Sequence, residues 1–303
     1  MNEQFIQSNG LTLAYDEFGH PDHPALVLIM GLGSQMVQWP PALCKALASH
    51  GYRVIRFDNR DIGLSEKIET SSPPNILSMM ALKVLGFTPS APYDLHDMAQ
   101  DAIGLLDALE LDAAHWVGVS MGGMIGQCLA ATFPERCRSL TSIMSSSGNP
   151  RLPQASLKIQ RQLLKSPPTH SQDAYIDHVV TTRKMFASPG FPITDEELKQ
   201  RVELSFHRNV HPAGFRNQMA AILKTGDRRA LLKRINTPTL VIHGHDDALV
   251  PVEAGIDTAK HIPTSTLHLI EGMGHDLAPG VCEAIEPLIV QHITRHDETS
   301  RAA

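Results

Sequence analysis

Short runs of apolar residues alternate along the chain with longer segments in which apolar positions recur at helical spacing. The runs with the length of a strand are 5–8, 11–18, 25–30, 52–57, 114–119, 139–144, 239–243 and 265–270. Helical spacing is found at 43–50, 95–109, 124–131 and 282–295. The first two runs flank Asn9 and Gly10, a pair that favours a hairpin turn. The alternation predicts an α/β protein with a mostly parallel sheet.

The pattern changes between residues 146 and 233, where apolar positions recur only at helical spacing. The helical segments expected there are 157–164, 173–186, 195–208 and 212–223, and prolines separate several of them. We therefore predict a core formed by residues 1–145 and 234–303, with a helical cap of residues 146–233 inserted into it. Residues 297–303 are expected to form a frayed tail.

A nucleophile turn is predicted at residues 118–122, which fit the pattern Gly-x-Ser-x-Gly. The buried run before it and the apolar helix after it place Ser120 at a sharp strand-to-helix turn. Side chains at Gly118 or Gly122 would collide with that turn. The pentapeptide alone is common, but its flanking elements favour a catalytic serine. The helix amino terminus also offers N–H groups to a developing oxyanion.

A second glycine-rich loop follows the run at 25–30, with the sequence Gly-Leu-Gly-Ser at residues 31–34. Such a loop could bind a phosphate, but no Walker lysine follows and the glycine spacing is not that of a dinucleotide site. An oxyanion hole is the better interpretation. The two N–H donors are then those of Leu32 and of Met121, the residue after the serine. No cofactor is expected.

Two later loops supply the other groups that a serine nucleophile needs. Asp246 and Asp247 follow the run at 239–243, and His275 follows the run at 265–270. The carboxyl ends of parallel strands meet at one edge of a sheet, so these side chains should lie near Ser120. His275 would take the serine proton, and a carboxylate would orient the imidazole.

Composition excludes several classes of protein. Apolar residues make up 42% and charged residues 19% of the 303 positions, which is ordinary for a globular protein. The net charge of −6 gives no reason to expect nucleic acid or an anionic membrane as a partner. The sixteen histidines are scattered, without the spacing of a metal site. The four cysteines are expected to be buried free thiols.

The amino terminus lacks the basic and apolar regions of a signal peptide, and no window is long and apolar enough to span a bilayer. We therefore expect a cytoplasmic enzyme that is a monomer or homodimer. Its partner should be a small-molecule ester substrate, without nucleic acid, metal or stable membrane association.

Three other features have structural interpretations. Trp39 is expected to pack in the core rather than line the site. Asp58 and Arg60 are interpreted as structural residues that pair to order the sheet edge. The apolar segment 76–87 is either a packed helix or a methionine-rich pocket wall or lid.

Together these motifs resemble the α/β-hydrolase family over nearly the whole chain. The motifs are residues 30–33, 58–65, 118–123, 244–251 and 272–275. The resemblance implies that the acid is Asp247, the fourth residue of Gly-x-x-Asp-x-x-Val-Pro, with Asp246 as the less favoured alternative. Within the family the chain is most similar to the carboxylesterase branch that includes aclacinomycin methylesterase, which also has Met-Gly at the start of its oxyanion loop. Serine as nucleophile separates it from the dehalogenases and epoxide hydrolases, which use aspartate.

The leading functional hypothesis is a serine carboxylesterase that acts on small to medium apolar acyl esters through an acyl-enzyme. A C–C bond hydrolase or a cofactor-free perhydrolase would use the same three side chains. A non-catalytic ligand-binding protein of this fold is a third hypothesis. The presence of all three triad residues makes it less favoured.

Overall fold

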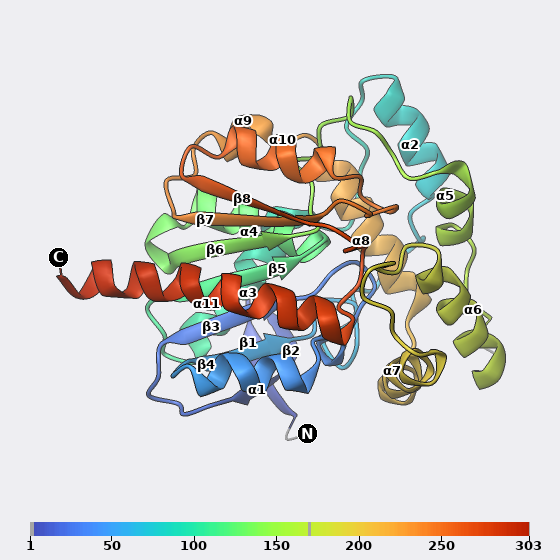
Figure 1. Ribbon diagram of the computed structural model, residues 1–303. Coiled ribbons are helices and arrows are strands. Elements are labelled where there is room, and N and C mark those ends of the chain that lie inside the picture. The colour runs from blue at the N-terminus through green and yellow to red at the C-terminus, as the bar shows by residue number, and fades with distance from the viewer. Residues whose placement is uncertain (1–2, 169–170, 303) are drawn as a thin grey trace.

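A computed structural model describes residues 3–168 and 171–302 of the chain. An eight-stranded sheet runs through the middle of the described part, in the order β1-β2-β4-β3-β5-β6-β7-β8 (Figure 1). The strands are β1 (Gln4–Ser8), β2 (Leu11–Phe18), β3 (Ala25–Ile29), β4 (Arg53–Phe57), β5 (Ala114–Val119), β6 (Cys137–Ile143), β7 (Thr239–Gly244) and β8 (Ser265–Ile270).

The sheet is parallel from β4 to β8, and β1 and β2 add an antiparallel edge. The β1–β2 turn has positive φ at both central residues, 49° at Asn9 and 77° at Gly10, as a two-residue hairpin requires. The predicted mostly parallel sheet is confirmed. Its six parallel strands bring the loops that follow them to one edge.

Helices cover both faces of the sheet. The helices of the core are α1 (Pro41–Ser49), α3 (Leu95–Ala108), α4 (Met121–Thr132), α10 (Glu253–His261) and α11 (Pro279–Ala302), with 3-10 turns at Met36–Gln38 and Pro134–Arg136. Successive residues of β3 point to opposite faces: Leu26 and Leu28 pack with α1 and α11, and Val27 and Ile29 with α3 and α4. This alternation divides the core into two apolar layers.

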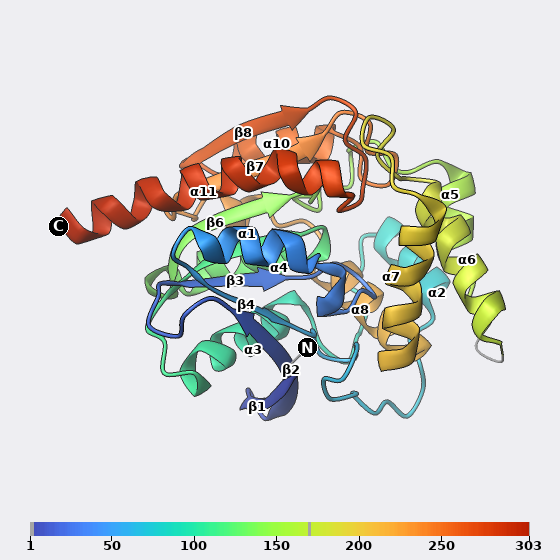
Figure 2. The ribbon, with the colours of Figure 1, turned by 60° about the horizontal axis from the view of Figure 1, so that its bottom comes forward.

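The remaining helices gather at the end of the molecule toward which the parallel strands run (Figures 1 and 2). They are α2 (Ile76–Val84), α5 (Leu157–Leu163), α6 (Gln172–Lys184), α7 (Asp195–Arg208) and α8 (Pro212–Thr225); the exception is the short α9 (Arg229–Leu232), which packs against α4 and α10. Between β6 and β7 the described residues form helices and loops without a strand. The division into core and cap at residues 146 and 233 stays a prediction.

The carboxyl terminus differs from the expected frayed tail. Helix α11 continues to Ala302 and includes Asp297, whose side chain is buried. Asp297 accepts hydrogen bonds from His115 at 3.0 Å and from Arg138 at 3.2 Å. The prediction was wrong at Asp297, because these partners lie more than 150 residues away and leave no local signal.

The four cysteines are buried and free, as predicted. Burial raises the pKa of Cys128 to about 11 and of Cys44, Cys137 and Cys282 to about 12. These thiols therefore stay protonated and unreactive at neutral pH. Within the described residues, no helix combines the length and apolar character needed to cross a membrane.

Candidate active site

Ser120 lies at the junction of β5 and α4 in a strained backbone conformation, with φ 55° and ψ −119°. A serine adopts positive φ only where its surroundings impose it. A Cβ on Gly118 would meet the backbone of Gly122, and one on Gly122 would meet the carbonyl oxygen of Ile29. The tight turn that presents Ser120 therefore needs glycine at both positions.

Ser120, His275 and Asp247 form a continuous hydrogen-bonded series. Ser120 Oγ lies 3.0 Å from His275 Nε2, and His275 Nδ1 lies 2.7 Å from Asp247 Oδ2. The three residues come from the loops after β5, β8 and β7, which share the carboxyl edge of the sheet. Asp246 is exposed, and its Oδ2 accepts a hydrogen bond from the Gly272 N–H at 2.9 Å. Of the two neighbouring aspartates, Asp247 contacts the histidine.

Asp247 is buried in a site that favours its ionised form. Oδ1 accepts hydrogen bonds from the N–H groups of Leu249 at 2.9 Å and Val250 at 2.8 Å. Burial alone would raise the pKa of Asp247, but the charge of His275 and contacts with His275 and His243 outweigh burial. The pKa of Asp247 therefore lies well below its ordinary value.

His243, a buried residue of β7, was not among the sequence candidates. Its Nε2 lies 2.8 Å from the Val250 carbonyl oxygen and 3.4 Å from Asp247 Oδ2. It therefore lies beside the same carboxylate oxygen, Oδ2, that His275 contacts. The only sequence signal was its place directly before the Gly-x-x-Asp motif.

The loop of residues 31–34 passes beside the nucleophile. A Cβ on Gly31 would lie 3.2 Å from Ser120 Cβ. The Ser34 N–H donates to the Gly31 carbonyl oxygen at 3.2 Å, which fixes the peptide plane that also carries the Leu32 N–H. Met121 is the first residue of α4, where an N–H has no partner within its helix. Both predicted oxyanion donors thus belong to segments next to Ser120.

Helix α8 contacts the loop of residues 31–34. The buried Gln218 accepts a hydrogen bond from the Gly33 N–H at 2.9 Å and donates to the Arg60 carbonyl oxygen at 2.9 Å. The ring of Phe215 lies against Gly33, where a Cβ would come within 2.6 Å of Cδ2. Sequence reasoning missed both residues because they look like ordinary positions of an amphipathic helix.

The histidine loop is supported by the segment between α6 and α7. The His275 N–H donates to the Phe186 carbonyl oxygen at 2.8 Å, and the Phe186 ring meets the imidazole edge-on at 6.0 Å. The Gly274 N–H donates to Ser188 Oγ at 2.9 Å, and the Gly190 N–H to the Gly272 carbonyl oxygen at 2.9 Å. Residues 186–190 thereby fix the loop that carries His275.

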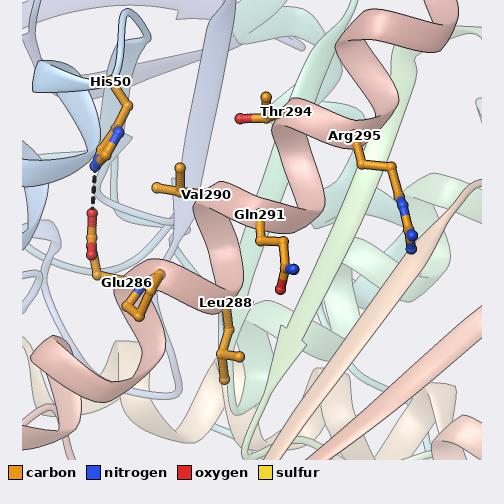
Figure 3. Close-up of a pocket in the computed structure, with 8 residues that line it drawn as sticks. His50, Glu286, Leu288, Val290, Gln291, Thr294 and Arg295 are labelled. Atoms are coloured by element: carbon orange, nitrogen blue, oxygen red, sulfur yellow. Dashed lines mark hydrogen bonds and ion pairs between the residues drawn. The ribbon is translucent and has the colours of Figure 1, made fainter.

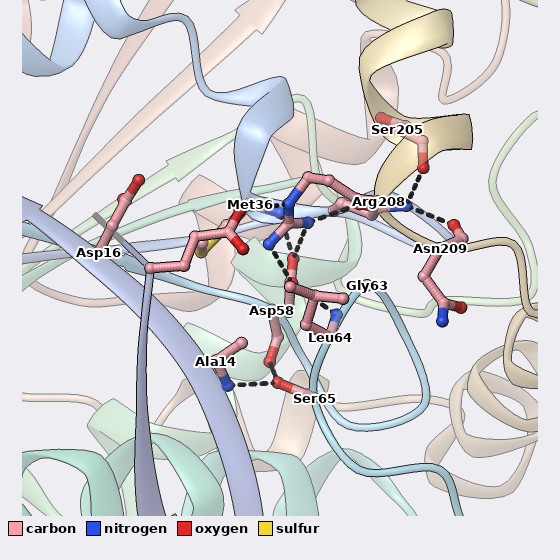
Figure 4. Close-up of polar contacts among 12 residues, drawn as sticks. Ala14, Asp16, Met36, Asp58, Gly63, Leu64, Ser65, Ser205, Arg208 and Asn209 are labelled. Carbon is pink, nitrogen blue, oxygen red and sulfur yellow. Dashed lines mark hydrogen bonds and ion pairs between the residues drawn. The ribbon is translucent and has the colours of Figure 1, made fainter. Parts of the chain in front are cut away.

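Asp58 ties the sheet edge to α7 (Figure 4). It is fully buried and accepts hydrogen bonds from the N–H groups of Met36 at 2.7 Å and Leu64 at 3.0 Å. Arg208 of α7 pairs with it at 2.9 Å. Arg60 instead pairs with Asp101 at 2.5 Å. Both residues are structural, but the expected contact between Asp58 and Arg60 does not form, because each has its own buried partner.

Two further features have structural roles. Trp39 is fully buried among the apolar residues of the layer that contains α1 and α11. Helix α2 packs Ile76 and Met79 against Ala220 of α8 and leaves most of its other apolar side chains exposed. Packing is thus the role of Trp39 and of one face of α2.

A second serine–histidine–aspartate set lies at the opposite edge of the sheet. His115 Nδ1 is 2.7 Å from Ser139 Oγ, and His115 Nε2 is 3.0 Å from Asp297 Oδ1. Ser139 and His115 are fully buried near the amino ends of β6 and β5. A hydroxyl enclosed in this way cannot meet a substrate, so the set fastens α11 to the sheet.

A surface hollow of about 680 Å³ lies along α11 beside the end of α1 (Figure 3). His50 and Glu286 form an ion pair of 2.8 Å at its edge. None of its lining residues belongs to the Ser120 group. Residues 3–168 and 171–302 contain no cluster of three or more histidine, cysteine, aspartate or glutamate side chains that could bind a metal ion.

Comparison with known proteins identifies the family. The sequence profile of the α/β hydrolase fold matches residues 24–278. The chain therefore belongs to the α/β hydrolase fold family, as its sheet and the loops around Ser120 indicate. The predicted fold class is confirmed.

Two individual proteins are similar to this chain over most of their length. Rhodomycin D methylesterase from Streptomyces peucetius is 28% identical over 311 residues, covering 96% of this chain and 98% of that protein. The enzyme 3-oxoadipate enol-lactonase 2 from Acinetobacter baylyi is 28% identical, covering 88% of this chain and 87% of that protein. The predicted resemblance to the branch of aclacinomycin methylesterase is confirmed as distant homology.

Solved structures support the fold. The meta-cleavage product hydrolase from Pseudomonas fluorescens IP01 aligns with a TM-score of 0.76 at 21% identity, covering 96% of this chain and 97% of that chain. At this level of identity the likeness concerns the fold alone.

Proposed function

We propose that the protein is a serine-dependent carboxylic-ester hydrolase with Ser120 as nucleophile, His275 as general base and Asp247 as the orienting acid. The hydrogen-bonded series from Ser120 through His275 to Asp247 is the observation that carries this proposal. Ionised Asp247 can only accept a hydrogen bond, so the imidazole proton belongs on Nδ1. Nε2 is then free to accept the serine proton.

The reaction follows from these positions. Ser120 Oγ attacks the ester carbonyl carbon while its proton moves to His275 Nε2. The carbonyl oxygen gains negative charge, which the N–H groups of Leu32 and Met121 stabilise. His275 then returns the proton to the leaving alcohol, and the acyl group remains on Ser120. A water molecule, deprotonated by His275, releases the carboxylic acid and restores the serine.

Apolar groups around the site support a small or medium apolar acyl group as substrate. The Phe186 ring borders the histidine, and the Phe215 ring borders the oxyanion loop. Two relatives are named as a methylesterase and an enol-lactonase, and both names refer to carboxylic-ester bonds. We therefore propose a carboxylic ester rather than an amide or a phosphate ester.

Hydrolysis of p-nitrophenyl esters from acetyl to palmitoyl tests the proposal, with wild type and Ser120→Ala in parallel. We expect activity that peaks at short or medium chains and is lost in the variant. A fluorophosphonate should label wild type only. Turnover in Ser120→Ala near that of wild type contradicts the mechanism. Labelling of Ser120 without ester turnover favours a C–C bond hydrolase or perhydrolase, and absent labelling favours a binding protein.

A further inference from the structure

The outer side of α2 and the residues after it form an unusually apolar surface. Eight of the eleven large apolar side chains that are exposed in the described chain belong to α2, to the residues directly after it, or to α5 and its carboxyl end. The α2 segment contributes Leu77, Met80, Leu82, Val84, Leu85 and Phe87. Val84 is 88% exposed and Phe87 is 62% exposed. A surface helix normally has polar residues on its outer face. A contiguous apolar surface of this kind marks an interaction site.

Helix α5, at the same end of the molecule as α2, has a basic face (Figures 1 and 2). Leu157 and Leu164 are exposed and lie seven residues apart, so they share one side of the helix. Lys158 and Arg161 are exposed on the same side, and Ile159 is buried on the other; Lys165 is exposed just after the helix ends. Apolar side chains beside lysine and arginine are typical of helices that lie on lipid surfaces.

The charge of the two segments is opposite to that of the whole chain. Residues 70–93 and 150–168 contain five lysine or arginine residues and no aspartate or glutamate, while the chain as a whole carries −6. Lys83 is the only one of the five in α2, and its ammonium group donates to the Leu223 carbonyl oxygen at 2.8 Å. The four on the α5 side, including Arg151, are exposed. The α5 side is therefore locally basic, although the chain as a whole is acidic.

Both segments lie at the same end of the molecule, beyond the carboxyl edge of the sheet (Figures 1 and 2). Helix α2 packs on α8, the helix that also contacts the loop of residues 31–34 through Gln218. The α2 part of the surface is therefore linked through α8 to the loop beside Ser120.

We infer that this surface, formed by residues 76–87 and 157–165, docks reversibly on an anionic lipid bilayer. The apolar side chains of α2 enter the interface, and the basic side chains of α5 contact lipid phosphates. A second copy of the chain fits less well. A two-fold interface would gather the basic side chains of both copies in one contact, without an acidic residue in either segment to offset them.

Sedimentation with vesicles tests the inference. Full-length protein is mixed with vesicles of phosphatidylcholine alone or with phosphatidylglycerol added, and the bound fraction is measured at low salt and at about 0.5 M NaCl. We expect binding to the anionic vesicles and at least about tenfold weaker binding to the neutral ones. High salt should weaken the anionic binding.

Matched variants locate the contact. Val84→Ser/Phe87→Ser and Lys158→Gln/Arg161→Gln should each weaken binding about tenfold. Phe5→Ser/Ile256→Ser and Lys233→Gln/Lys260→Gln remove exposed residues of the same kinds elsewhere and should bind as wild type does. Unchanged thermal unfolding shows that each variant is folded.

Several results overturn the inference. Absent vesicle binding does so, as does equal binding to neutral and anionic vesicles. Equal loss in test and control variants would place the contact elsewhere. A dimer in sedimentation equilibrium that the Val84→Ser/Phe87→Ser variant dissociates would assign the surface to a second copy. None of these readouts depends on ester hydrolysis, so they stand apart from the proposed function.

Discussion

Replacing Gln218 by methionine tests whether α8 sets the geometry of the oxyanion loop. Methionine matches glutamine in length and volume but cannot accept the Gly33 hydrogen bond or donate to Arg60. The wild-type side chain is fully buried and makes these two contacts at 2.9 Å each. The substitution therefore removes the partner of the Gly33 N–H and of the buried Arg60 carbonyl.

Two magnitudes limit the expected effect of this substitution on kcat. Each unpaired buried backbone group costs about 1–3 kcal/mol, which the loop can avoid by rotating its peptides toward other partners. Such a rotation moves the adjoining Leu32 N–H. Complete loss of one oxyanion donor costs about 100- to 1,000-fold in kcat, which sets the upper limit. We expect a partial loss, about ten- to a hundredfold in kcat, with KM changed by less than about threefold, because the ground-state ester contacts this donor weakly.

Steady-state kinetics on the best p-nitrophenyl ester provides the measurement, together with the rate of Ser120 labelling by a fluorophosphonate. Gln38→Met is the matched control. Gln38 also joins the sheet edge to the helices above it, through the Arg201 carbonyl oxygen at 3.0 Å and Ser205 Oγ at 2.7 Å. Its loss should lower stability without lowering kcat. Wild-type kcat in Gln218→Met, or equal kcat losses in both variants, would refute a specific role of Gln218.

Three further predictions concern the acid, a buried ion pair and the terminal helix. Asp247→Asn should lower kcat by about 10⁴-fold, because an amide favours the wrong histidine tautomer. Asp246→Asn should lower kcat by less than about tenfold. If kinetics on the two variants gave the reverse order, the acid would be Asp246. Arg208→Met should lower the free energy of unfolding by about 3–5 kcal/mol in urea titrations, because it leaves a buried carboxylate unpaired. Lys184 and Asp195 form an exposed ion pair of 2.5 Å. Its loss in Lys184→Met should cost less than about 1 kcal/mol, and equal costs in the two variants would contradict the argument. Asp297 is buried, which by itself raises its pKa, but contacts with an imidazole lower that pKa from 3.8 to about 2. Its contribution is complete above about pH 4 and disappears as pH falls toward 2, so Asp297→Asn should flatten the acid-side loss of stability.

The sheet could be predicted because each strand is indicated by residues that are adjacent in the chain. The eight strand predictions agree with the observed strands to within two residues at each end, since buried parallel strands are short continuous apolar runs. Once the strands are parallel, the loops after β5, β7 and β8 must meet at one edge. The approach of Ser120, Asp247 and His275 follows from chain order and strand direction.

Helix α10 was not predicted because it buries small residues. Ala254, Gly255 and Thr258 face the core, and none gives a strong hydrophobic signal. Gly255 lies against the ring of His243, where a larger side chain would collide. Helix α10 therefore packs closely through small residues and lacks the periodic large apolar residues from which a helix is predicted.

The supports of the candidate site could not be predicted, since each joins residues far apart in the chain. Gln218 and Gly33 are 185 positions apart, and Arg208 and Asp58 are 150 apart. A buried glutamine within a helix has the same sequence signature as an exposed one. The partner becomes visible only when the helix is placed over the sheet.

These supports make the helices above the sheet part of the active-site geometry. Gln218 fixes the loop on one side of Ser120, and the Phe186 carbonyl oxygen fixes the backbone of His275 on the other. A movement that separated the helices from the sheet would break both contacts and disturb the oxyanion donors and the base together. Substrate access that preserves activity is therefore compatible with movement of α2, which packs on α8 through Ile76 and Met79 and contributes neither contact.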